Sequence, residues 1–137
     1  MNKAPADGAE LAKEIASFVS KDESVEVVVC PTAVALDRVS QVIEGSAVKL
    51  GAQNLYPKSS GAYTGEISAE MLRAVFAKYV ILGHSERREY FHESDAFVNE
   101  KVKFSLGSNL NPILCIGETL QQREAEETLK GVKTQLL

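Results

Sequence analysis

Short apolar runs alternate with helical patterns along this chain, and the alternation limits the folds it can adopt. Between the helical segments, runs rich in valine, isoleucine and leucine have the near-continuous apolar character of buried strands. Strands of this kind, separated by helices, form a parallel sheet with right-handed crossover connections. The sequence therefore predicts an α/β fold with about four parallel strands, over residues 25–30, 47–51, 79–82 and 112–116.

The segments between these runs have helical periodicity and recognisable ends. Ser68 and Ser94 are suitable N-caps, and Gly45 is suited to end a helix. Helices are predicted over residues 10–20, 33–44, 69–76, 85–91, 95–106 and from 119 onward. No linker divides the chain, so residues 1–137 are interpreted as one domain. Periodicity alone leaves two architectures open, a doubly wound sheet and part of a (β/α)8 barrel.

Composition argues against several classes of function. The net charge is −4 and the basic residues are scattered, which does not favour a nucleic-acid partner. No run of about 18 apolar residues could span a membrane, and residues 1–7 lack the apolar core of a signal peptide. Cys30 and Cys115 lie in apolar runs, so we expect buried free thiols in a reducing cytoplasm, with a single disulfide as the alternative. Neither metal-ligand spacing nor a nucleotide-binding glycine motif is present, so no metal or cofactor is expected.

The residues best suited to chemistry follow the apolar run 79–82. Gly83 ends that run, and His84 and Glu86 come directly after it. Catalytic groups gather just past the carboxyl ends of parallel strands. A short helix after His84 would place the imidazole at a positive helix N-terminus, which disfavours the imidazolium form. A neutral imidazole can donate a hydrogen bond to a substrate carbonyl and so assist proton abstraction next to it.

Each candidate also has a structural interpretation. His84 could be a satisfied structural histidine, and Glu86 could pair with a neighbouring arginine. Arg87 and Arg88 are better suited to ion pairs with Glu93 or other acids than to phosphate binding. The remaining candidates are Gln53 and Asn54 as rim or turn residues, Cys115 as a packed thiol, and residues 61–66 as a plain connection or a docking loop.

Several segments resemble the triose-phosphate isomerase family, in the same order and at compatible spacing. The most specific is the run 79–88, which reads Tyr-Val-Ile-Leu-Gly-His-Ser-Glu-Arg-Arg. The others are residues 51–54, 61–68, 91 with 93–95, and 113–120 with 123–125, so the resemblance covers nearly the whole chain. It implies a TIM barrel, of which this chain would form strands two to five with their helices.

The resemblance implies an enzyme of glycolysis and gluconeogenesis that interconverts dihydroxyacetone phosphate and glyceraldehyde 3-phosphate through an enediolate, without a metal or organic cofactor. By this resemblance, His84 would polarise the substrate carbonyl and Glu86 would support the active site. Further implied roles are Asn54 at the rim of the site, Cys115 as a buried thiol behind it, Arg87 with Glu93 as a structural ion pair, and Tyr63, Thr64 and Gly65 on the loop that enters the neighbouring subunit of a homodimer.

The same resemblance implies that parts of the enzyme lie outside this chain. A family barrel needs about 250 residues. The catalytic lysine would directly precede Met1, whereas the general-base glutamate, the lid and the phosphate loops would follow Leu137. We therefore expect this chain alone to be inactive. His92 and Glu126 stand where the family usually has glycine, which affects the expected loop geometry.

A half barrel would leave apolar surface uncovered. Its first and last strands, near Val25 and Ile113, would be open edges, and the inward faces of the strands would lack a covering layer. We therefore expect a partner, either a complementing half-barrel or a second copy of the chain. The alternative function is a non-catalytic half-barrel that serves as an assembly or interaction module. Another phosphosugar enzyme on the same barrel is disfavoured by the run 83–88.

Overall fold

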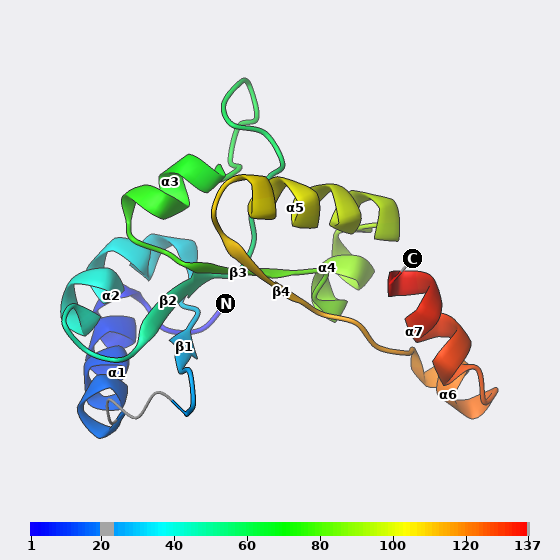
Figure 1. Ribbon diagram of the computed structural model, residues 1–137, viewed down its shortest axis with the longest axis horizontal. Helices are drawn as coiled ribbons and strands as arrows, with labels where there is room; N and C mark the ends of the chain where they lie inside the picture. Colours follow the sequence, from blue (N-terminus) through cyan, green and yellow to red (C-terminus); the bar gives the residue numbers. More distant parts are fainter. Residues whose placement is uncertain (20–23, 137) are drawn as a thin grey trace.

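Four parallel strands form a single sheet in the computed structural model, which describes residues 1–19 and 24–136 (Figure 1). The strands pair in chain order, β1-β2-β3-β4, with Tyr79 opposite both Gly51 and Asn111. A doubly wound sheet would reverse its strand order at one point, whereas neighbouring strands of a barrel follow one another around it. The predicted α/β class is therefore confirmed, and the strand order matches part of a barrel. The strands are β1 Val28–Val29, β2 Lys49–Ala52, β3 Tyr79–Leu82 and β4 Asn111–Leu114.

Helices connect the strands at the predicted places, with some differences at their ends. The first helix begins at Pro5, earlier than predicted, because proline is well suited to the first helical turn. Its predicted end at Ser20 lies outside the described residues. Ser68 and Ser94 cap their helices as predicted, accepting hydrogen bonds from the N–H groups of Met71 and Phe97. The helical elements are α1 Pro5–Phe18, the 3-10 turn η1 Ala33–Ala35, α2 Leu36–Ile43, α3 Ala69–Ala74, α4 Ser85–Tyr90, α5 Asp95–Gly107, α6 Leu120–Glu124 and α7 Thr128–Leu136.

The core lies on the face of the sheet that packs against the helices. Val80 and Leu82 of β3 are fully buried there, and they belong to one cluster with Val39 of α2 and Leu72 of α3. The alternate β3 residues point to the other face and are only half-buried. The sheet therefore has one well-covered face, and that face anchors the strand that leads to His84.

The last strand is an exposed edge, as predicted for a half barrel. Ile113, Leu114 and Ile116 are 37%, 36% and 42% exposed. The expectation that both thiols are free is confirmed for the described residues, but the expectation that they are buried is wrong, because both are only partly covered. Cys115 follows this edge strand, beside which the described residues form no further strand.

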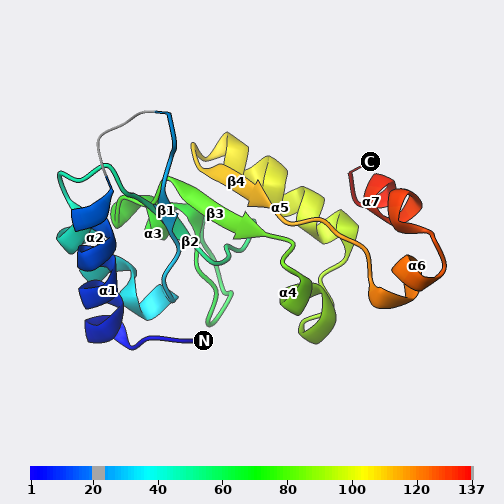
Figure 2. The same cartoon turned by 90° about the horizontal axis from the view of Figure 1, so that it is seen from below.

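The C-terminal helices stand apart from the sheet, at the end of the extended segment after β4 (Figures 1 and 2). Their leucines are not covered by the sheet, since Leu120, Leu129 and Leu136 are 70%, 85% and 58% exposed. The predicted single helix from residue 119 is wrong, since Glu126 has φ 58° and ends α6. Its N–H donates to Arg123 O and that of Glu127 to Gln122 O, which is the hydrogen-bond pattern of a Schellman helix end.

Left-handed residues end several other helices as well. Gly45 follows α2 with φ 76°, which agrees with its predicted role. Phe76, His92 and Asn109 have φ 64°, 54° and 58° after α3, α4 and α5. Phe76 also explains why α3 is shorter than the predicted helix over 69–76. A Cβ in this conformation is strained, so glycine is the usual occupant of such a position.

We predict that His92→Gly raises stability, because it relieves the strain of a left-handed non-glycine residue. Glycine also increases the entropy of the unfolded chain, which offsets part of the relieved strain. The net gain in the free energy of unfolding should therefore be about 1 kcal/mol. Urea unfolding of the purified chain measures it. The matched control is Glu89→Gly in the interior of α4, which should lose roughly 1 kcal/mol. A loss of equal size for both variants would contradict the assignment of strain to His92.

Candidate active site at the carboxyl ends of the strands

The polar groups singled out in the sequence follow the carboxyl ends of the strands. Asn54 lies after β2, His84 after β3 and Cys115 after β4. Because neighbouring strands are parallel, these residues are placed at one edge of the sheet. Gln53 links two strand ends, since its Nε2 donates to Cys30 O over 3.0 Å. The structure therefore brings the candidates from three loops to a common rim.

Gly83 makes the turn that aims His84 away from β3. Its φ is 72°, and an added Cβ would lie 3.0 Å from Val98 Cγ1 and 3.1 Å from Cys115 O. Arg88 secures the turn, because its Nε donates to Gly83 O over 2.7 Å and its Nη1 pairs with Asp95. Both backbone conformation and space therefore require glycine at this position.

His84 is the N-cap of α4, as expected from the sequence. Its carbonyl accepts from the N–H groups of Arg87 and Arg88, and its ring Nδ1 accepts from the Glu86 N–H over 3.3 Å. A nitrogen that accepts an N–H carries a lone pair, so this hydrogen bond assigns the ring proton to Nε2. The tautomer that this hydrogen bond favours is a neutral imidazole, and no hydrogen-bond partner of its Nε2–H is found among the described residues.

Glu86 is close to the histidine but mostly in solvent. Its Oε2 lies 3.6 Å from His84 Nδ1, and its side chain is 73% exposed. A carboxylate would favour a proton on Nδ1, in competition with the backbone N–H. An exposed pair at this distance contributes little free energy. The backbone N–H and the helix N-terminus therefore decide which ring nitrogen carries the proton. Within the described residues, the alternative pairing of Glu86 with Arg87 or Arg88 is not found.

The two arginines hold the loops around the histidine together. Arg87 Nε donates to Glu93 Oε1 over 2.8 Å, so the ion pair suggested for these residues is present. Its guanidinium also lies 4.7 Å from the centre of the Phe91 ring. Both contacts hold α4 against the segment that leads into α5. The guanidinium groups of Arg87 and Arg88 are therefore engaged in structural interactions.

Lys101 is a central residue that the sequence interpretation missed. It lies on α5, and only 1% of its side chain is exposed. Its Nζ donates to Glu93 Oε1 and, over 2.9 Å, to Asn54 Oδ1. Its spacing in the sequence could have revealed its burial. Lys101 lies three residues after Val98 and four before Ser105, so it is on the same face of α5 as these two buried residues.

The charges of Glu93, Lys101 and Arg87, which form one cluster, depend on one another. Burial alone would raise the pKa of Glu93, but hydrogen bonds from Lys101 and Arg87 outweigh it and leave that pKa below its ordinary value. Burial lowers the pKa of Lys101, and the Glu93 carboxylate only partly offsets this. A charged Glu93 therefore stabilises two cations, one on each side of the loop that joins α4 to α5.

The loop with Tyr63, Thr64 and Gly65 projects from the molecule (Figure 1). All three residues are exposed, and the Tyr63 ring stacks on Tyr56 with centroids 4.6 Å apart. This loop is thus available to a neighbouring molecule, and its residue Gly65 lines a pocket together with the rim residues Gln53 and Asn54. The partly exposed Cys115 thiol has a raised pKa because of desolvation, which Arg88 partly offsets.

The part of the chain that the structure describes contains no cluster of three or more His, Cys, Asp or Glu residues suited to a metal ion. No helix among these residues is long and apolar enough to cross a membrane.

Comparison with known proteins identifies the family. The family model described as triosephosphate isomerase matches residues 1–137. This chain belongs to the triosephosphate isomerase family. The triosephosphate isomerase of Alkaliphilus oremlandii is 51% identical over 137 residues, covering 100% of this chain and 55% of that protein. Those of Rhodopirellula baltica and Clostridium botulinum are 50% and 51% identical over 136 residues, covering 99% of this chain and 54% of each protein. The chain thus spans about half the length of the curated triosephosphate isomerases it matches.

We predict that Lys101→Met destabilises the fold by about 3 kcal/mol, because it leaves the buried Glu93 carboxylate with only one cationic partner. Urea unfolding measures the change. Lys103→Met on the same helix is the matched control, since Lys103 is exposed and should change stability by less than about 0.5 kcal/mol. Equal effects of the two substitutions would show that the cluster does not stabilise the fold.

Proposed function

We propose that this chain supplies the electrophilic part of a triosephosphate isomerase active site. The reaction is the interconversion of dihydroxyacetone phosphate and D-glyceraldehyde 3-phosphate by proton transfer through an enediolate. The observation that carries the proposal is the hydrogen bond from the Glu86 N–H to His84 Nδ1, which leaves a neutral Nε2–H as a donor at the strand ends. Family membership names the reaction, and the histidine geometry fits its needs.

In the proposed mechanism, the Nε2–H of His84 donates to the substrate carbonyl oxygen. When a base removes the neighbouring proton, negative charge develops on that oxygen and the hydrogen bond becomes stronger. A donor that is already aimed at the developing charge lowers the barrier, with a typical effect of about 10²- to 10³-fold in kcat. Glu86 would support the site from the adjacent helical turn, and Asn54 would line its rim.

The remaining catalytic parts are assigned by family resemblance to the portion of the relatives that this chain does not span. These are the lysine, the general-base glutamate and the phosphate loops. We further propose a cytoplasmic enzyme that works without metal or organic cofactor. Its partners would be the triose phosphate and a second subunit or complementing half-barrel, with Tyr63, Thr64 and Gly65 on the docking loop.

A specific observation favours a second candidate, the non-catalytic assembly module. Leucines of α6 and α7 are exposed, as are Ile113 in β4 and Ile116 just after it, which is unusual for a monomer in water. Light scattering after size-exclusion chromatography tests the second candidate, because an assembly module must associate. A well-folded monomer would rule the module out.

We predict that His84→Asn lowers kcat by at least about 100-fold in a completed barrel, made by joining residues 1–137 to the flanking segments of the Alkaliphilus oremlandii relative. Asparagine can still cap α4 but has no imidazole donor. Steady-state isomerase assays measure the change, and the 137-residue chain alone should show no activity above background.

The control for this experiment is His92→Asn, because His92 is exposed and asparagine tolerates its left-handed conformation. This variant should retain its full kcat. An inactive completed barrel would contradict the proposed function, as would a His84→Asn variant whose kcat equals that of His92→Asn.

A further inference from the structure

Exposed apolar side chains lie on two helices at opposite ends of the molecule, α1 and α7 (Figures 1 and 2). On α1, Leu11 and Phe18 are 42% and 87% exposed, and on α7, Leu129 and Leu136 are 85% and 58% exposed. Apolar side chains that are grouped on a protein surface mark an interaction site. None of these residues belongs to the rim around His84, so the chemistry proposed there does not account for them.

The opposite side of each helix is used within the molecule. Ala9 and Ala12 are buried where α1 packs against α2. Gly131 is the buried residue among those described in α7, and a Cβ added there would lie 3.1 Å from the Gln122 side chain of α6. Each helix therefore has one side that packs on its own neighbour and another whose large apolar residues face the solvent.

The two exposed stripes match in length and in spacing. The α1 stripe consists of Leu11, Ile15 and Phe18, at intervals of four and three residues, and the α7 stripe consists of Leu129, Val132 and Leu136, at intervals of three and four. Alternating intervals of three and four residues form the seam of paired helices, here over about two turns or 10 Å. The order of the intervals is reversed, so the stripes match when the helices run antiparallel.

The charges of the two helices are opposite. The helix α1 contains three acids and one lysine, whereas α7 contains two lysines and no acid; the three acids are Asp7, Glu10 and Glu14, and the two lysines of α7 are Lys130 and Lys133. All of these charged residues are exposed. Two copies of the same helix would bring like charges together, but α1 beside α7 brings opposite charges together. The charges therefore favour a contact between unlike helices of two molecules.

A cavity beside α7 has room for part of the partner. About 390 Å³ in volume, it lies between α7 and α5, and Leu136, Val102 and Leu114 are among the residues that line it. In the antiparallel arrangement, Leu11 of a second molecule is placed opposite Leu136. Its side chain can extend into this cavity and cover apolar surface that the chain leaves open.

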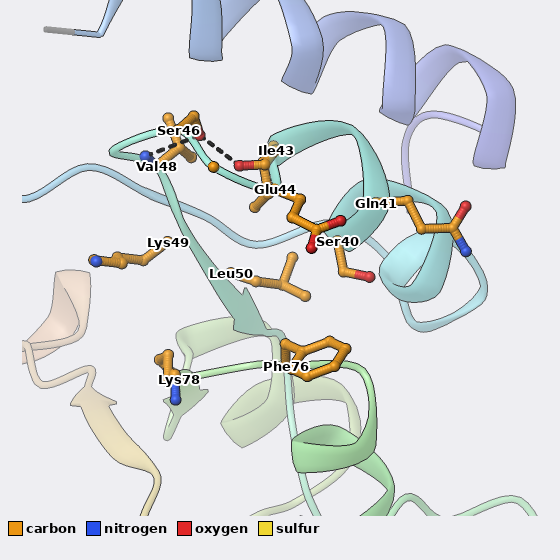
Figure 3. A pocket seen from close by; sticks show the side chains of 11 residues that line it. Ser40, Gln41, Ile43, Glu44, Ser46, Val48, Lys49, Leu50, Phe76 and Lys78 are labelled. Atoms are coloured by element: carbon orange, nitrogen blue, oxygen red, sulfur yellow. Dashed lines mark hydrogen bonds between the residues drawn. The ribbon is translucent and has the colours of Figure 1, made fainter. Parts of the chain in front are cut away.

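The pocket in Figure 3 offers no comparable site. It lies between the end of α2 and the start of β2, and its charged residues are Glu44, Lys49 and Lys78. Because it contains both a carboxylate and two lysines, its charge selects neither an acidic nor a basic partner. It also shares no residue with the α1 stripe or the α7 stripe, so it gives no basis for choosing a partner.

We propose that the α7 stripe of this chain binds the α1 stripe of a second copy. The two helices run antiparallel, and the stripes form a common apolar seam flanked by opposite charges. Because the stripes lie at opposite ends of the molecule, two copies make the contact twice and close as a dimer with twofold symmetry. This contact names the partner for the second candidate function, the assembly module, and it does not depend on the isomerase reaction.

The test uses two charge-reversed chains, with masses measured by light scattering after size-exclusion chromatography at low salt. Lys130→Glu with Lys133→Glu makes α7 acidic like α1, and Glu10→Lys with Glu14→Lys makes α1 basic like α7. We expect the unaltered chain to be a dimer and each reversed chain to have a Kd at least about tenfold higher. An equimolar mixture should regain the dimer mass, because both contacts then join opposite charges. A monomeric unaltered chain, or a mixture that stays dissociated, would overturn the proposal.

Arg38→Glu with Lys103→Glu is the matched control for charge. Both residues are exposed, and this pair changes the net charge by the same amount as the reversal on α7, so the dimer should persist. Urea unfolding verifies that every variant is folded, and exposed substitutions of this kind should change stability little. Dissociation of the control to the same extent as the α7 reversal would overturn the proposal, because net charge alone would then explain it.

A second pair of variants tests the apolar seam. Leu129→Ser should raise the Kd of the dimer at least about tenfold, whereas Leu106→Ser on α5, where the side chain is 58% exposed, should leave it unchanged. Tyr63→Ser tests the docking loop on the same chain and should also leave the dimer intact. A dimer that Tyr63→Ser breaks and Leu129→Ser does not would overturn the assigned surface. None of these measurements uses isomerase activity, so their failure is distinct from failure of the proposed reaction.

Discussion

The buried Glu93 carboxylate is the interaction on which the arrangement of the site depends. It accepts from Arg87 on α4 and from Lys101 on α5, and Lys101 also holds Asn54 after β2. Burying charges costs free energy, and here two cations that contact the carboxylate oxygen Oε1 offset part of the cost, whereas Oε2 is buried without a hydrogen-bond partner among the described residues. The cluster therefore fixes the orientation of α4, whose first turn contains the histidine.

The position of α4 in turn determines the state of His84. Gly83 supplies the left-handed turn, and the N–H of Glu86 then meets Nδ1 of the ring. The same backbone groups that end β3 and begin a helix thus favour a neutral imidazole with its proton on Nε2. The two arginines that follow His84 and Glu86 have structural roles. Arg87 pairs with Glu93, and Arg88 pairs with Asp95.

Much of this arrangement could be predicted from the sequence, because strands, helix caps and the turn at Gly83 depend on local patterns. The burial of Lys101 could not, since it requires a carboxylate eight residues away and an amide from a distant loop. The break at Glu126 was missed because glutamate rarely adopts a left-handed conformation, although the resemblance placed a glycine at this position. The exposure of Cys115 was missed because an apolar run predicts a strand but not whether a further element covers it.

The central claim is that His84 is neutral and carries its proton on Nε2. NMR of the chain with ¹⁵N-labelled histidine measures this directly at pH 7, with the exposed His92 as a reference within the same molecule. The account predicts a protonated Nε2 and an unprotonated Nδ1 in His84. An imidazolium at this pH, or a proton on Nδ1 alone, would contradict it, because neither form could accept the Glu86 N–H at Nδ1.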